Sequence, residues 1–332
     1  MPQDSSTAPY LNIPDSTDAP ALHGSTDYLA YPEQSVMEKT DVVRENLPFV
    51  LFVFFALIIV RIIMRARMEA AHDNENTIRN NTFVSPSNIR PFKYSGDQLS
   101  FTTQEWQQIL SKHSPYFRSL SAPDREKFIS RCRKFISKKI FFIHSTTIFK
   151  EMPVLVSASA IQLSFGLDKY LYPHFKYLHI YPEEFIRIQP TLCFLQGNVS
   201  GHSIRLSWKH FLKGIENSSD GQDVGLHEMS HALYYQTFVT ERHVDRDFRD
   251  FFEDFNDDGN KVYQVEQALE AGLYSRYAML NFQEFWAESI EIFFEKPLLL
   301  REKYPDLYEA MKNILNQDPA SKMKDTLGGQ PG

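Results

Sequence analysis

The sequence predicts an α+β domain that follows a single membrane-spanning helix and a disordered N-terminal tail. Three observations support this prediction. A hydrophobic fraction of 42% in 332 residues is enough for one large domain or two small ones. An apolar run occupies Leu47–Met64, before that domain. From about residue 91 onward, segments with helical periodicity are mixed with segments that read as strands.

The N-terminal region is expected to lie outside the folded domain. Residues 1–45 are rich in Ser, Thr, Asp, Pro and Ala and show no helical or strand period, which indicates a disordered tail. Residues 46–66 are predicted to form a transmembrane helix. At about 1.5 Å per residue this helix reaches across most of a hydrocarbon core of about 30 Å. Residues 67–90 then read as a polar linker.

The charges beside the predicted span indicate its orientation. Arg61, Arg65 and Arg67 lie at its C-terminal end or follow it, whereas only Lys39 and Arg44 precede it closely. The positive-inside rule therefore places the C-terminal domain in the cytoplasm of a single-pass membrane protein.

Composition argues against some partners. The formal net charge of −7 speaks against a nucleic-acid partner, because phosphate contacts need a basic footprint. The two cysteines are too few for a disulfide framework, and their spacing fits no zinc ribbon.

The folded domain is predicted to cover residues 91–320, with a flexible C-terminal tail at 321–332. Residues 103–112 and 123–139 read as helices, and 153–165 as a helix or a strand. Residues 177–182 read as a strand. The alternation of Ser203–Trp208 predicts a half-buried strand, a candidate edge on which an extended peptide could add.

The strongest chemical signal is LHEMSHALYYQ at 226–236. His227 and His231 are four residues apart, so on a helix they differ by about 40° in azimuth and face one point. Two imidazoles placed in this way can bind one Zn²⁺. Glu228 lies beside the first histidine and reaches a metal-bound water rather than the metal, so it is the predicted general base.

A third protein ligand is expected from a later helix. A catalytic zinc takes three protein ligands and keeps one position open. Residues 282–295, FQEFWAESIEIFFE, carry Glu284, Glu288 and Glu291 within about 60° of one another on a helix. Such a stripe of carboxylates on an otherwise apolar helix is costly to bury without cations. Spacing alone leaves open which glutamate binds the metal.

A second segment resembles a metal-binding motif but is not interpreted as a metal site. Asp254, Asn256, Asp258 and Gly259 match the start of a calcium-binding loop, but Val265 stands where the closing glutamate belongs. The segment therefore reads as a turn after an aromatic helix.

Taken together, these segments resemble the zinc-dependent peptidases related to Mlc titration factor A, over roughly residues 90–320. The resemblance rests on the HExxH at His227–His231 and on four further segments in the same order. These are Leu206–Trp208, FFEDF at 251–255, YAMLNFQEFWAESIEIFFEKP beginning at Tyr277, and YPDLYEAMKNILNQDP at 304–319.

The resemblance implies a gluzincin-type zincin fold, related to the catalytic domain of anthrax lethal factor. It assigns Glu284 as the third zinc ligand and Tyr277 as a donor to the oxyanion of the tetrahedral intermediate. Glu291 matches a further acidic position of the motif. Unlike the soluble founding members of the family, this chain carries a predicted membrane anchor.

The expected function is therefore that of a membrane-anchored zinc metallopeptidase. It would hydrolyse peptide bonds of a peptide or protein substrate through a zinc-bound water, with Glu228 as the base. The family founder binds a transcriptional repressor, so an alternative remains. In that alternative the chain is a membrane-tethered module that sequesters a transcriptional regulator, with weak or vestigial peptidase activity.

Overall fold

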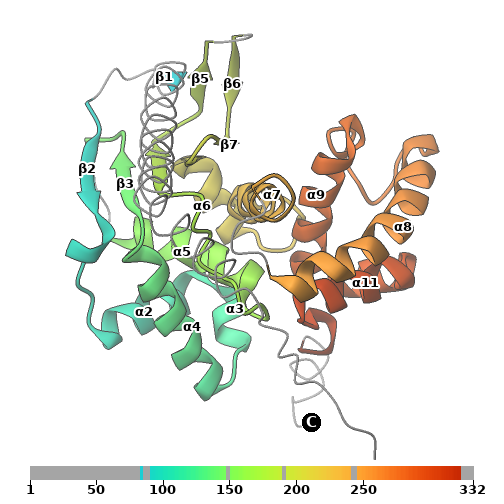
Figure 1. Ribbon diagram of the computed structural model, residues 1–332, viewed down its shortest axis with the longest axis horizontal. Helices are drawn as coiled ribbons and strands as arrows, with labels where there is room; N and C mark the ends of the chain where they lie inside the picture. Colours follow the sequence, from blue (N-terminus) through green and yellow to red (C-terminus); the bar gives the residue numbers. More distant parts are fainter. Residues whose placement is uncertain (1–82, 85–89, 147–149, 189–191, 241–244, 323–332) are drawn as a thin grey trace, which may run out of the picture. The chain divides into compact units, whose positions relative to one another are not determined.

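Figure 1 shows the computed structural model of the chain. The residues that it describes are 83–84, 90–146, 150–188, 192–240 and 245–322. The predicted tail, the predicted span at 46–66 and most of the predicted linker lie outside these ranges. Within the described ranges, no helix combines the length and the apolar character needed to cross a bilayer.

A five-stranded mixed sheet forms the first part of the domain. Its strand order is β2-β3-β4-β8-β7. The strands β3, β4 and β8 are parallel, while β2 and β7 pair antiparallel at the two edges. The strands are β2 (Phe92–Ser95), β3 (Ile140–Ile143), β4 (Tyr177–Tyr181), β7 (Gly197–Ser200) and β8 (Ser203–Ser207).

Helices supply most of the remaining described structure, and with the sheet they confirm the predicted α+β class. The N-terminal helices are α2 (Thr103–His113), α3 (Pro115–Ser119), α4 (Ala122–Ile136) and α5 (Glu151–Ser164). The later helices are α6 (Trp208–Glu216), α7 (Val224–Phe238), α8 (Arg246–Ala268), α9 (Phe282–Glu295), α10 (Pro297–Lys303) and α11 (Pro305–Leu315). Short 3₁₀ turns occupy Gly96–Gln98 (η1) and Ala278–Leu280 (η2).

The central helices are buried. Segment 153–165, which the sequence leaves as helix or strand, lies almost entirely in α5, and twelve of the 14 residues of α5 are buried. This helix packs against α7, and α7 packs against both α9 and the β7–β8 edge of the sheet. Because α7 is enclosed in this way, its position relative to α9 is fixed by packing on several sides.

A smaller three-stranded sheet has the order β1-β5-β6. Its strands are β1 (Phe83–Val84), β5 (Phe185–Arg187) and β6 (Cys193–Leu195), all antiparallel. In Figure 1 the β5–β6 pair extends beyond the larger sheet, above β7. Since β6 ends at Leu195 and β7 begins at Gly197, this small sheet leads directly into the edge of the larger one.

The prediction for Ser203–Trp208 is wrong in three respects. All five residues of β8 are buried, rather than every second one, and Trp208 begins α6. The strand is also not an edge, because β4 lies on one side of it and β7 on the other. Arg205 accounts for part of the discrepancy, since its guanidinium lies 4.1 Å from the ring centroid of Phe83 and is covered.

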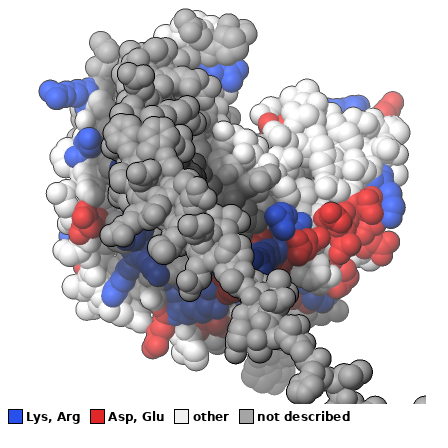
Figure 2. All heavy atoms as spheres, in the orientation of Figure 1, with Lys and Arg blue, Asp and Glu red and all other residues white. Residues whose placement is uncertain are grey.

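The interpretation of Asp254–Gly259 as a turn is also wrong, because the segment is continuous helix within α8. Phe248, Phe252 and Phe255 form the buried face of that helix. Gly259 is buried against Phe282 and Phe285, so the small residue serves a close helix contact and not a turn. Acidic side chains occupy the solvent side, and Figure 2 shows them gathered over α8 and α11.

Candidate metal centre

The helix α7 begins at a capped and closely packed N-terminus. Asp223 is the N-cap, and its Oδ1 accepts the backbone N–H of Leu226 at 2.9 Å. Gly225 follows in the first turn, where a Cβ would be forced against Phe211 and Ser159. Glycine therefore allows α7 to lie close to α5 and α6, and this contact places the next turn, with both histidines, opposite α9.

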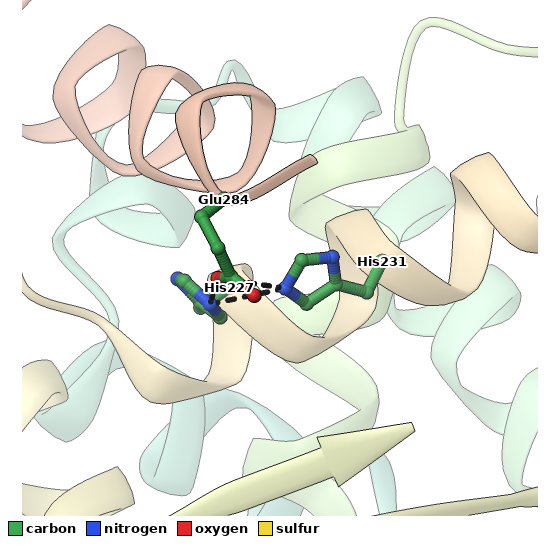
Figure 3. Close-up of side chains that lie close together, drawn as sticks. All are labelled: His227, His231 and Glu284. Carbon is green, nitrogen blue, oxygen red and sulfur yellow. Dashed lines mark hydrogen bonds and ion pairs between the residues drawn. The ribbon is translucent and has the colours of Figure 1, made fainter. Parts of the chain in front are cut away.

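Three donor atoms meet between α7 and α9 (Figure 3). His227 Nε2 lies 3.1 Å from His231 Nε2 and 3.1 Å from Oε2 of Glu284. His231 Nε2 lies 3.3 Å from the same oxygen. The structure thus brings together the two histidines and the glutamate that the sequence and its resemblance had singled out.

This triangle fits a metal ion of the zinc type. In a tetrahedral site with bonds of about 2.0–2.1 Å, neighbouring ligand atoms are separated by about 3.3 Å. The three separations are close to that value. Two imidazoles and one carboxylate also form the donor set of known catalytic zinc sites, which leave a fourth position open.

Glu291 contacts the ring nitrogen of His227 that does not face the other two donors. Its Oε1 lies 2.7 Å from Nδ1 of His227, and its Oε2 accepts the backbone N–H of Asp223 at 2.5 Å. A carboxylate at Nδ1 accepts a hydrogen bond from the N–H of that nitrogen, which leaves the lone pair on Nε2, directed toward the other two donors. Glu291 is therefore a second contact between α9 and the beginning of α7.

Glu288 has a different partner. Its two oxygens accept the backbone N–H of Ser275 at 2.6 Å and the hydroxyl of Ser275 at 2.5 Å. The same hydroxyl oxygen accepts the N–H of Ala278 at 3.2 Å. Because Tyr277 lies between these two residues, Glu288 anchors the short segment that carries Tyr277.

A buried carboxylate fixes the beginning of that segment. Glu266, near the end of α8, accepts the backbone N–H groups of Leu273 and Tyr274 at 3.2 and 3.3 Å. The ammonium of Lys303 lies 2.8 Å from it, and the hydroxyl of Tyr304 also donates to it. The segment before Tyr277 is thus tied to α8, α10 and the beginning of α11.

Glu228 points into the same region from α7. Only 7% of its surface is exposed, and its Oε2 has no hydrogen-bond partner among the described residues. Burial raises the pKa of Glu228, while His227 and His231 oppose that shift. Gly197 of β7 packs directly on this carboxyl group, and a Cβ at that position would collide with it.

Tyr277 lies at the open side of the site. Its ring centroid is 6.2 Å from that of His227, and 56% of its surface is exposed. Burial of the hydroxyl and the negative charges of Glu284 and Glu228 raise the pKa of Tyr277 to about 12. The hydroxyl therefore stays protonated near neutral pH and can act as a hydrogen-bond donor.

The charges of the metal-binding group are mutually dependent. Burial lowers the pKa of His227, but contacts with Glu284 and Glu291 outweigh it and raise the pKa well above the usual value. Burial likewise raises the pKa of Glu284, whereas the contacts with His227 and His231 lower it to about 2. A carboxylate that is ionised across the physiological pH range suits a metal ligand.

Sequence reasoning missed two acidic residues beside the site. Glu295 continues the stripe of α9 by one more turn, and its Oε2 accepts the N–H groups of Gly221 and Gln222 at 2.6 and 3.2 Å. Its position four residues after Glu291 was a usable signal. Glu266 carried no such signal, because it belongs to another helix and its side-chain partners, Lys303 and Tyr304, are distant in sequence.

Comparison with known proteins places the chain in a family. The sequence profile of the glucose-regulated metallo-peptidase M90 family matches residues 96–315. The chain belongs to this family. The resemblance found in the sequence is thereby confirmed, and the family implies a metal ion of the kind that the His-His-Glu group can hold.

The chain is also similar to one curated protein, at low sequence identity. An uncharacterized protein of Synechocystis sp. is 23% identical over 232 residues, which covers 64% of this chain and 84% of that protein. This relative supplies no activity that could be transferred to the chain.

Proposed function

We propose that the chain is a zinc-dependent peptidase. The observation that carries the proposal is the unpaired, buried Oε2 of Glu228 next to a group of three metal-type donors. A buried carboxylate oxygen without a partner is costly unless a substrate or water uses it. Membership of a metallopeptidase family supports the same chemistry.

His227, His231 and Glu284 are the proposed ligands. A bound zinc ion supplies a Lewis acid that polarises the scissile carbonyl and lowers the pKa of a water molecule. Glu228 takes a proton from the attacking water at Oε2 and passes it to the leaving amine. The hydroxyl of Tyr277 donates a hydrogen bond to the carbonyl oxygen as negative charge develops on it.

The edge strand β7 is the proposed docking strand for an extended peptide, in place of β8. Gln196 accepts the N–H of Ser207 at 2.7 Å, so in the antiparallel pair the backbone groups of Gly197 and Val199 point away from β8. Val199→Pro removes one of these outward N–H groups without breaking the β7–β8 ladder. Unchanged KM and turnover in this variant would exclude β7 as the docking strand.

Location is part of the proposal. We infer that residues 46–66 anchor the protein in a membrane and that the peptidase domain faces the cytoplasm, on the strength of the apolar run and the arginines after it. Sequestration of a transcriptional regulator, the alternative kept open by the sequence, gains no support from the geometry of the described residues.

The experiment that tests the peptidase proposal uses the full-length chain in detergent, loaded with zinc. Cleavage of a mixed peptide library is compared between the unmodified protein and Glu228→Gln. The proposal predicts cleavage products that disappear in the variant, while the zinc content of the variant is unchanged. Equal cleavage by both proteins would rule out Glu228 as the base.

A further inference from the structure

The strands β6 and β7 form one continuous stretch of chain that passes the proposed site. β6 ends at Leu195 and β7 begins at Gly197, so only Gln196 separates them. Each is the last strand of its sheet among the described residues, with β5 as the neighbour of β6 and β8 as the neighbour of β7. The open edge of β7, the proposed docking strand, therefore continues into β6.

Gly197 fixes this edge against the site. A Cβ on Gly197 would lie 2.3 Å from Oε1 of Glu228, so the backbone of β7 rests directly on the carboxyl group of the proposed base. Phe194 of β6 precedes Gly197 by three residues, a distance of about 10 Å in extended chain. A bound peptide that reaches the base can therefore also reach Phe194.

One face of the small sheet packs inward. Phe83 and Phe185 contact each other edge to face, with ring centroids 5.9 Å apart. Phe185 is buried and stacks on Tyr181 of β4, with centroids 4.5 Å apart. Because successive side chains of a strand point to opposite faces, the neighbours of Phe83 and Phe185 in the sequence point outward.

The outward face of the small sheet is apolar and exposed. Val84, Ile186 and Phe194 are cross-strand neighbours on it, since Val84 pairs with Ile186 and Ile186 pairs with Phe194. Ile188 and Leu192 continue the same alternation just beyond the paired residues. Phe194 and Leu192 are each 64% exposed, Ile188 is 46% exposed and Val84 is 38% exposed. Single exposed apolar residues are common, but a group of them on one sheet face is typical of a binding surface.

We propose that this apolar face binds the part of the substrate that follows the scissile bond, so that the site prefers peptides with a large apolar residue there. The inference rests on the proposed peptidase function and on docking at β7. A strand that adds to the edge in the antiparallel sense, the more stable of the two, runs opposite to the direction from β6 to β7. Its residues beside β6 then lie on the carboxyl side of those beside Gly197. With Gly197 at the base, Phe194 faces a substrate residue about two to four positions after the scissile bond.

Continuity with the edge that carries Gly197 favours a peptide as the occupant. β6 offers an open edge for backbone hydrogen bonds and, on the outward face, the side chains of Phe194 and Leu192 for apolar contacts. Recognition by strand addition uses both, because the backbone supplies affinity and alternate side chains supply specificity. A bilayer surface or a second copy of the chain would cover the face without making cleavage depend on the sequence of the substrate.

The sequence profile of the cleavage sites tests the inference. The zinc-loaded full-length protein is placed in lipid nanodiscs, which keep free detergent off the apolar face, and it cleaves a mixed peptide library whose products are identified by mass spectrometry. Large apolar residues should exceed Ser and Asn by about tenfold at one position, about two to four residues after the cut. Phe194→Thr should remove this enrichment, and Phe194→Glu should replace it with a preference for Lys and Arg.

Val265→Thr, a change of an exposed apolar residue of α8, is the matched control and should keep the enrichment. The melting temperatures of the Phe194 variants should stay close to that of the unmodified protein, because the side chain is largely exposed. The same profile in all four proteins, or no apolar enrichment after the cut in the unmodified protein, would overturn the inference.

Failure of the peptidase proposal is distinguishable from failure of this inference. Binding is measured by fluorescence anisotropy in Glu228→Gln, with empty nanodiscs as the blank. The probes are a labelled peptide of Thr and Ser with Leu at alternate positions, and the same peptide with Ser in place of Leu. The Leu peptide should bind about tenfold more tightly, and adding Phe194→Thr should remove the difference even where no cleavage occurs. Equal binding of the two peptides, or a difference that Phe194→Thr leaves unchanged, would overturn the inference.

Discussion

His227 Nδ1 lies 2.7 Å from Oε1 of Glu291, and this contact joins the proposed metal site to the N-terminus of α7. The other oxygen of Glu291 accepts the N–H of Asp223, the residue that caps the helix. One carboxylate thus orients a ligand and fixes the start of the helix that carries it. Removal of Glu291 should therefore affect metal binding as well as stability.

Glu291→Gln should weaken zinc binding by about 10- to 100-fold, as expected for the loss of a carboxylate behind a ligating histidine. The amide keeps the shape of the side chain but provides a weaker acceptor for the Nδ1 proton. Competition with a chelator of known affinity measures the change. Glu288→Gln is the matched control on the same helix face, and it should bind zinc as the unmodified protein does.

Glu288→Ala should lower kcat by about tenfold with little change in zinc content, because it releases the segment that carries Tyr277 rather than a ligand. Ser275→Ala removes the other partner of the same contact. If the contact acts as a unit, the double variant should lose no more than the single variants. Additive losses in kcat would show that the two residues act independently.

Tyr277→Phe should retain zinc and lower kcat by about 10²- to 10³-fold, the usual cost of one oxyanion donor. KM should change little, because the hydrogen bond strengthens only as charge develops in the transition state. Steady-state kinetics on a peptide cleaved by the unmodified protein measure both constants. A loss confined to KM would assign Tyr277 to substrate binding.

Glu295 gives a prediction on pH. Burial and the nearby charges of Asp223 and Glu291 raise the pKa of Glu295 to about 8, above its value in the unfolded chain. The folded protein then favours the neutral acid, so stability falls as pH rises from the unfolded pKa toward 8. In Glu295→Gln the amide oxygen can still accept the N–H of Gly221. The amide does not ionise, so the pH-dependent contribution of the carboxyl group is removed.

The melting temperature of Glu295→Gln, relative to that of the unmodified protein, should therefore increase between about pH 5 and pH 8 and then level off. A zinc-free preparation should show the same trend, since Glu295 does not contact the proposed ligands. A difference that is independent of pH would contradict the raised pKa of Glu295.

The metal-site residues were predictable to different degrees. The spacing of His227 and His231 on a helix sufficed to predict that their side chains converge. Glu284, Glu288 and Glu291 share one helix face, so their spacing could not separate their roles. Their partners do so: the histidine pair, the backbone of Ser275 and the Nδ1 of His227. These partners lie in other elements, and only the tertiary structure brings them together.

The fold was predicted where local pattern decides it and missed where neighbours decide it. The helix predicted at 123–139 is present as α4, which ends three residues earlier, at Ile136, and buries Phe128, Cys132, Phe135 and Ile136. The edge was assigned to the wrong strand because β7, with the sequence GNVS, has no strand-like alternation and pairs with β8 through a tight turn at Gly201. Asp254–Gly259 was misassigned because its aromatic neighbours, and not its acidic residues, determine its conformation.

The most direct test of the central claim is the zinc content of the full-length protein in detergent, measured by elemental analysis. His231→Ala and Glu284→Ala are compared with the unmodified protein, and Glu288→Ala serves as a control that removes a carboxylate from the same helix face. We expect about one zinc per chain in the unmodified protein and in the control, and loss of zinc in the two ligand variants. Absence of zinc from the unmodified protein after loading, or equal zinc in all four proteins, would contradict the proposed metal centre.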